Sequence, residues 1–135
     1  MPDFSIDFLD HVAIRVKNLE HSARWYETVL GLKRYSPEQW QPFPIFLLAG
    51  KTGIALFPAN TSHPVHDQAS RNVKIDHFAF QVSQDNFAKA RAHYEALKIP
   101  YSFQDHHYFH SIYTQDPDGH TVELTTLVVE ADEFY

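Results

Sequence analysis

The chain has 135 residues, of which 44% are hydrophobic and 15% aromatic, and it contains no cysteine. This length and composition predict one globular domain with a sizeable core. The lack of cysteine excludes disulfide frameworks, iron–sulfur clusters and cysteine nucleophiles. The 11 basic and 17 acidic residues give a net charge of −6, and no basic stripe indicates nucleic acid or an anionic membrane as a partner. No apolar run approaches the roughly 20 residues of a membrane span, and the N-terminus lacks a signal-peptide pattern, so we expect a cytoplasmic protein.

The first predicted elements lie between residues 8 and 57. Residues 8–16 alternate apolar and polar side chains, which predicts a strand with His11 and Arg15 on the face away from the core. Asn18 is typical of a helix N-cap and Gly31 of the residue that follows a helix, so we expect a helix between them. Shorter strands are expected at about 33–36, 44–49 and 53–57.

The same pattern returns in the second half of the chain, after residues 59–73, which lack periodicity and predict a linker. Ile75-Asp76-His77-Phe78-Ala79 repeats Leu9-Asp10-His11-Val12-Ala13 with an offset of 66 residues. Ser83 is the predicted N-cap of a second helix, whose apolar stripe ends at Leu97. Further strands are expected at about 101–104, 108–115 and 121–126.

This internal repeat predicts an α+β fold of two tandem βαβββ modules. The modules span about residues 7–58 and 74–127 of a single domain at residues 1–135. Neither module alone is expected to bury both its helix and its sheet well. We therefore expect the two sheets to curve around a shared, open, barrel-like cleft, with equivalent residues of the repeat facing each other across it.

Histidine is frequent, with ten in the chain and eight of them after residue 60. His11 and His77 hold equivalent places in the repeat, and the last predicted strand offers the carboxylate of Glu123. Two imidazoles and one carboxylate form the 2-His-1-carboxylate set, which binds a divalent metal and leaves positions open for substrate or O₂. The alternative is that each Asp-His pair is a local capping arrangement without a metal.

Two segments of the sequence match the opening and closing motifs of one superfamily. They are Asp10-His11-Val12-Ala13 and Asp116-Pro117-Asp118-Gly119-His120-Thr121-Val122-Glu123-Leu124. Together with Trp25-Tyr26 and Leu30-Gly31-Leu32 at the first helix, they make nearly the whole chain resemble the vicinal oxygen chelate superfamily. Its members include glyoxalase I, fosfomycin-resistance transferases, bleomycin-binding proteins and extradiol dioxygenases, which these motifs do not separate.

The resemblance implies that His11, His77 and Glu123 are metal ligands. The family's remaining ligand position falls on Ala55, which cannot bind a metal. This departs from glyoxalase I, which has Glu or Gln there, and agrees with the three-ligand dioxygenases and fosfomycin enzymes. We expect one divalent ion, with Fe(II) favoured and Mn(II), Ni(II) or Zn(II) as alternatives.

Small extradiol dioxygenases offer a further resemblance around the last strands. It assigns His106 as the catalytic acid–base group and Tyr113, ten residues before Glu123, as the group that hydrogen-bonds the substrate. Fosfomycin transferases also match at Ser111 and Tyr113, but they have Thr where this chain has Ala13, and this chain is acidic after Glu123. The resemblance therefore favours ring cleavage of an aromatic diol.

Four residues are predicted to line the substrate site: Arg15, Phe57, Tyr108 and Ser111. The preferred function is an extradiol-type ring-cleaving dioxygenase whose small substrate binds the metal through vicinal oxygens. Two alternatives stay open. One is a glyoxalase-like lyase or isomerase with a fourth ligand from elsewhere, and the other is a metal-free protein that binds a drug or metabolite. The resemblance also implies a homodimer.

Overall fold

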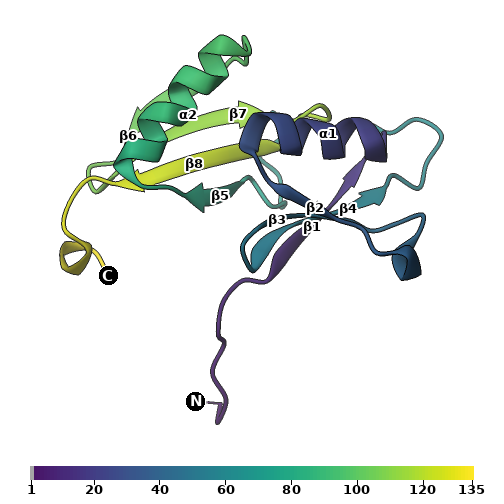
Figure 1. The fold of residues 1–135 in the computed structure, drawn as a ribbon, viewed down its shortest axis with the longest axis horizontal. Coiled ribbons are helices and arrows are strands. Elements are labelled where there is room, and N and C mark those ends of the chain that lie inside the picture. Colours follow the sequence, from purple (N-terminus) through teal and green to yellow (C-terminus); the bar gives the residue numbers. More distant parts are fainter. Residues whose placement is uncertain (1) are drawn as a thin grey trace. The chain divides into compact units, whose positions relative to one another are not determined.

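The computed structural model describes residues 2–135, in which one compact unit ends at Pro64 and a second begins at Val65. This boundary lies inside the 59–73 stretch that the sequence predicts as a linker. Each unit has a four-stranded sheet and one α-helix (Figure 1). Among the described residues, no helix has the length and apolar character needed to cross a membrane.

The first unit is a βαβββ module with strand order β1-β4-β3-β2. Its elements are β1 (His11–Val16), α1 (Leu19–Leu30), β2 (Lys33–Tyr35), the short 3-10 helix η1 (Glu38–Trp40), β3 (Ile45–Ala49) and β4 (Thr52–Pro58). β1 runs parallel to β4, whereas the other pairs are antiparallel. The first strand is shorter than predicted, because residues 8–10 precede its ladder with β4, and η1 was not predicted.

Helix α1 begins and ends where the sequence predicts. The Asn18 side chain accepts a hydrogen bond from the backbone N–H of His21 at 2.8 Å. Gly31 follows the helix with a left-handed φ of 67°, and its N–H donates to Glu27 O at 3.1 Å. The helix packs its buried side, which comprises Ser22, Ala23, Tyr26 and Val29, against β3 and β4. The core residues from the sheet are Ile14, Val16, Ile45, Leu47, Ile54, Ala55 and Leu56.

The second unit repeats this arrangement with strand order β5-β8-β7-β6, and β5 runs parallel to β8. Its elements are β5 (Phe78–Gln81), α2 (Gln84–Ala96), β6 (Ser102–Asp105), β7 (Phe109–Gln115), β8 (Thr121–Leu127) and the short 3-10 helix η2 (Ala131–Glu133). The two modules confirm the predicted α+β fold. The sequence did not predict η2.

Three details of the second unit differ from the prediction. His77 lies one residue before β5 rather than within it. Leu97 is 39% exposed, because α2 ends at Ala96 and the chain turns at Lys98, which has a left-handed φ of 58°. Tyr108 lies in the turn before β7, since the backbone N–H of His106 donates to Phe109 O at 2.8 Å and closes the β6–β7 hairpin early.

The register of the two sheets identifies equivalent positions directly. Ala13 pairs with Ala55 in the first sheet, and Ala79 pairs with Glu123 in the second. Ala13 and Ala79 are 66 residues apart and hold the same place in the repeat. Ala55 therefore occupies in the first module the position that Glu123 occupies in the second, as the sequence alignment of the two halves predicts.

Candidate metal centre and catalytic residues

Glu123 is a buried carboxylate on β8, only 7% exposed, with a close polar neighbour at each oxygen. Its Oε1 lies 2.9 Å from Nε2 of His77. Its Oε2 accepts a hydrogen bond from Oγ of the fully buried Ser111 at 2.7 Å. Ser111 and Thr125 pair across β7 and β8, and their hydroxyl oxygens lie 2.9 Å apart. These contacts satisfy a buried charge and fix its orientation.

The orientation of His77 is set by its neighbour in the sequence. Nδ1 of His77 lies 2.8 Å from Oδ2 of Asp76, and this hydrogen bond lowers the pKa of the Asp76 carboxyl. Nε2 is therefore the nitrogen that faces Glu123. A carboxylate that holds one ring nitrogen of a histidine and leaves the other free is the usual support of a histidine metal ligand.

His11 has the same local arrangement in the first unit. Its Nδ1 lies 2.7 Å from Oδ1 of Asp10, so its Nε2 is likewise left for another partner. The imidazole centroid lies 5.0 Å from the ring of Phe46, which is in turn 4.9 Å from the ring of Trp40. The predicted ligand thus borders Phe46, a residue that the sequence pattern did not single out.

The donor chemistry of these residues fits a divalent metal, but neither unit holds a complete ligand set. In residues 2–135, no group of three or more His, Asp or Glu side chains has an arrangement that could hold a metal ion. The second unit brings His77 and Glu123 together, whereas His11 belongs to the first unit. The predicted set of His11, His77 and Glu123 is therefore divided between the two units.

Tyr113 and His106 form a second polar pair in the second unit. The Tyr113 hydroxyl lies 2.8 Å from Nε2 of His106, and the Tyr113 ring packs edge-on against His77 with centroids 5.6 Å apart. Burial, together with the negative charge of Glu123, raises the pKa of Tyr113 to about 12. At neutral pH this phenol is therefore a neutral hydrogen-bond donor next to the His77–Glu123 pair.

The predicted lining residues are divided between the units. Arg15 and Phe57 pair across β1 and β4, with the guanidinium 5.8 Å from the Phe57 ring centroid. Nη1 of Arg15 also donates to Pro58 O at 2.9 Å. Ser111 contacts Glu123 directly, whereas Tyr108 is 38% exposed in the β6–β7 turn and lies edge-on to His107, with ring centroids 4.6 Å apart.

Comparison with known proteins agrees with this description. Residues 8–124 match the model of the Glyoxalase/Bleomycin resistance protein/Dioxygenase superfamily. Glutathione transferase FosA of Serratia marcescens is 27% identical over 116 residues, which cover 86% of this chain and 78% of that protein.

Solved structures show the same fold at low sequence identity. A glyoxalase/dioxygenase from Nostoc punctiforme is 20% identical with a TM-score of 0.80, and the match covers 96% of this chain and 97% of that one. The fosfomycin resistance protein FosX from Mesorhizobium loti is 22% identical with a TM-score of 0.66, and covers 97% of this chain and 100% of that one. The superfamily includes enzymes, and its members typically bind a divalent metal. On its motifs, its two βαβββ modules and a match that spans most of its length, this chain belongs to the glyoxalase/bleomycin resistance/dioxygenase superfamily, the vicinal oxygen chelate proteins.

Proposed function

We propose that the protein is a divalent-metal-dependent, extradiol-type dioxygenase that opens the ring of a small aromatic diol. His11, His77 and Glu123 are the proposed metal ligands. The observation that carries the proposal is the contact between His77 Nε2 and Glu123 Oε1, 2.9 Å apart, with Tyr113 and His106 paired beside it.

The three proposed ligands are prepared for a metal in the same way. Asp10 and Asp76 hold the Nδ1 atoms of His11 and His77, which leaves both Nε2 atoms as ligands. Ser111 holds one oxygen of Glu123 and leaves Oε1 for the metal. Ala55 occupies the family's remaining ligand position and cannot bind a metal. A metal held by His11, His77 and Glu123 would therefore keep coordination positions open for small molecules.

A metal on this ligand set, Fe(II) in the favoured form, would bind the two vicinal oxygens of a diol and supply the oxygen chemistry. The chain's own residues then position the substrate and move its proton. The neutral Tyr113 hydroxyl donates a hydrogen bond to a substrate oxygen, since its raised pKa keeps the proton in place. His106, 2.8 Å from that hydroxyl, is the group that takes up and returns a proton.

The first test is the metal content of the chain after anaerobic reconstitution with Fe(II), Mn(II), Ni(II) or Zn(II). We expect one equivalent per chain in the wild type and in the control His21→Ala, which removes an exposed histidine on α1. His11→Ala, His77→Ala and Glu123→Gln should each lose the metal. Equal metal content in the wild type and these three variants would refute the ligand set.

The second test is the reaction itself. Fe(II)-loaded protein is exposed to O₂ with a panel of catechols, and the yellow ring-fission product is followed by absorbance. His106→Ala and Tyr113→Phe should lower kcat by about 10²-fold or more with the metal retained, as expected for groups that handle a proton. No product from any catechol with a fully loaded protein would reject ring cleavage.

One finding supports a second candidate, the metal-assisted transfer of a thiol to a small electrophile. Glutathione transferase FosA of Serratia marcescens matches most of this chain, and Ser111, one of the two residues at which the sequence resembles fosfomycin transferases, donates a hydrogen bond to Glu123. Against it stand Ala13 and the acidic residues that follow Glu123, namely Glu130, Asp132 and Glu133. Mass spectrometry of Mn(II)-loaded protein with glutathione and fosfomycin distinguishes the two: a covalent adduct supports transfer, and its absence together with ring cleavage excludes it.

A further inference from the structure

The proposed acid–base group, His106, begins a tight and strained turn between β6 and β7. The backbone N–H of His106 donates to Phe109 O, and the N–H of Tyr108 donates to His106 O, both at 2.8 Å. His107 has a left-handed φ of 70°, which is unfavourable for a residue other than glycine. The Asp105 carboxylate accepts the His107 N–H at 2.9 Å and helps to hold this conformation.

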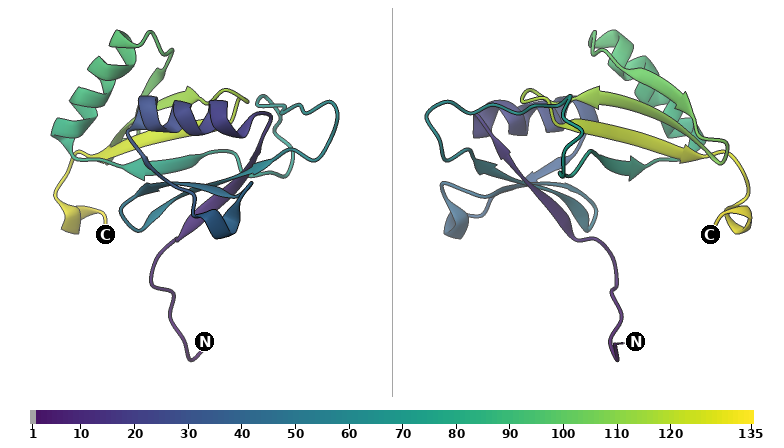
Figure 2. Two further views of the ribbon diagram at one scale, coloured as in Figure 1. Left: turned by 45° about the vertical axis from the view of Figure 1, so that its right-hand side comes forward. Right: turned by 180° about the vertical axis from the view of Figure 1, so that it is seen from behind.

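The C-terminal residues pack on this same turn. The ring centroid of Phe134 lies 5.4 Å from that of Tyr108 and 4.8 Å from that of Phe109. Tyr135 adds contacts at 5.0 Å to Phe134 and 6.4 Å to Phe109. The backbone N–H of Val128 also donates to Tyr108 O at 2.9 Å. Figure 2 shows how the chain leaves β8 and forms η2, which directly precedes Phe134 and Tyr135.

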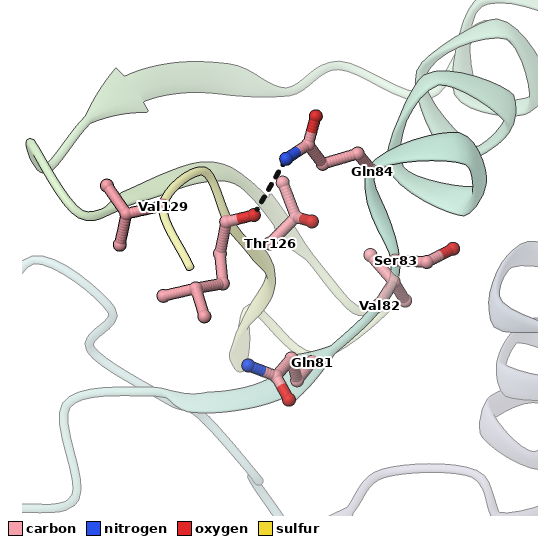
Figure 3. A pocket seen from close by; sticks show the side chains of 7 residues that line it. Gln81, Val82, Ser83, Gln84, Thr126 and Val129 are labelled. Atoms are coloured by element: carbon pink, nitrogen blue, oxygen red, sulfur yellow. Dashed lines mark hydrogen bonds between the residues drawn. The ribbon is translucent and has the colours of Figure 1, made fainter. Parts of the chain in front are cut away.

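The start of the C-terminal segment is more buried than its end, since Thr126 is 2% exposed and Phe134 is 49% exposed. A pocket of about 410 Å³ lies beside it (Figure 3). Its lining residues are Gln81, Val82, Ser83, Gln84, Thr126, Leu127 and Val129. The Thr126 hydroxyl is buried and has no hydrogen-bond partner within the described part of the chain. The contacts that join the segment to the turn include the Val128–Tyr108 backbone hydrogen bond and the ring contacts of Phe134 with Tyr108 and Phe109.

We infer that Phe134 is a positioning residue for His106. It does not contact His106, but it packs on Tyr108 and Phe109, whose backbone atoms hold the His106 backbone in the turn. A side chain that hydrogen-bonds through a single atom, as His106 does with Tyr113, keeps its place only while its backbone is fixed. The catalytic meaning of this role rests on the proposed function, whereas the positioning itself is a property of the second unit.

The test that does not depend on activity is the NMR signal of the His106 imidazole nitrogens in the metal-free protein. Tyr113→Phe supplies the reference spectrum for a broken His106–Tyr113 contact. In Phe134→Ala we expect the His106 Nε2 signal to move most of the way to that reference, with backbone amide signals outside the turn unchanged. Phe134→Tyr should restore the wild-type signal, and the control Phe4→Ala, at an exposed phenylalanine, should not change it.

An unchanged His106 signal in Phe134→Ala would overturn the inference. If that variant does not fold, Phe134→Leu, which keeps apolar volume but removes the ring, is measured instead. A shifted His106 signal in that variant supports the inference, and an unchanged signal overturns it. In the ring-cleavage assay Phe134→Ala should lower kcat by about tenfold with little change in KM, because a small displacement of a proton-transfer group affects the chemical step. Loss of ring cleavage in every protein, with a shifted NMR signal, would reject the proposed function and leave the positioning role standing.

Discussion

Ser111 donates its hydroxyl proton to Oε2 of Glu123 across 2.7 Å, and both side chains are almost completely buried. A buried carboxylate needs such a partner, because without one its charge is costly and its position is poorly defined. Ser111 thus prepares Glu123 as a ligand, and the pair is the most protected polar contact of the candidate centre.

Ser111→Ala should weaken metal binding without removing a ligand. The loss of one hydrogen bond to a ligating carboxylate lowers metal affinity by about tenfold or more. The affinity is measured by competition with a chromophoric chelator. Ser102→Ala, on the exposed edge strand β6, is the matched control and should bind as the wild type does. An affinity unchanged by Ser111→Ala would show that Ser111 does not support the ligand.

Tyr113 should keep its proton far into the alkaline range. Its pKa of about 12 in the folded protein exceeds the ordinary value of 10.0, so the folded state favours the neutral phenol. The contribution of the neutral phenol to the free energy of unfolding is fully present below about pH 10 and is lost as the pH rises toward 12. Ultraviolet titration of tyrosinate, as the difference between the wild type and Tyr113→Phe, should show this midpoint. A midpoint near 10 would contradict the buried environment.

Tyr94 offers a test of buried polarity away from the candidate centre. Its side chain is 1% exposed, and its hydroxyl has no hydrogen-bond partner among residues 2–135. Tyr94→Phe removes that unsatisfied group and should leave the free energy of unfolding unchanged or raise it by up to about 1 kcal/mol. Tyr94→Ala, which leaves a cavity, should lower it by about 3–5 kcal/mol. Urea denaturation measures the free energy of unfolding of both variants. A marked loss of stability in Tyr94→Phe would contradict the lack of a hydrogen-bond partner for the Tyr94 hydroxyl.

Gly53 should not tolerate a larger residue. It pairs with His11 across β1 and β4, and a Cβ at this position would collide with the backbone oxygen of Leu47. Gly53→Ala should therefore lower the free energy of unfolding by about 3 kcal/mol, since a backbone contact cannot move aside easily. Gly50→Ala is the comparison, because Gly50 has open space around it. This substitution should lower the free energy of unfolding by only about 1 kcal/mol, because alanine is strained at the left-handed φ of Gly50. Equal unfolding energies for the two variants would contradict the close approach.

The sequence predicted most of the fold because the determining signals are local. Asn18, Gly31 and Ser83 set the helix boundaries through hydrogen bonds to residues a few positions away. The equivalence of Ala55 and Glu123 also followed from the sequence, because a repeated strand pattern fixes which positions share a register.

Other features escaped prediction because they depend on contacts between distant segments. The packing of Phe134 on Tyr108 joins the end of the chain to a turn, and no periodicity signals it. The early end of α2, which leaves Leu97 exposed, depends on the left-handed backbone at Lys98. The candidate ligands His77 and Glu123 were identified from the repeat and the last predicted strand, and again by resemblance, while the direction in which His77 points became visible only through its contact with Asp76.

The parallel pairing of β1 with β4, and of β5 with β8, has a consequence for biosynthesis. In each unit the strand made first is hydrogen-bonded to the strand made last, so the sheet cannot close before β4 or β8 has left the ribosome. Since the sheet of the first unit is complete at Pro58, that unit can acquire all of its ladder hydrogen bonds while residues 65–135 are still being translated. Such vectorial closure, one module after the other, limits the time during which unpaired strand edges are open to aggregation.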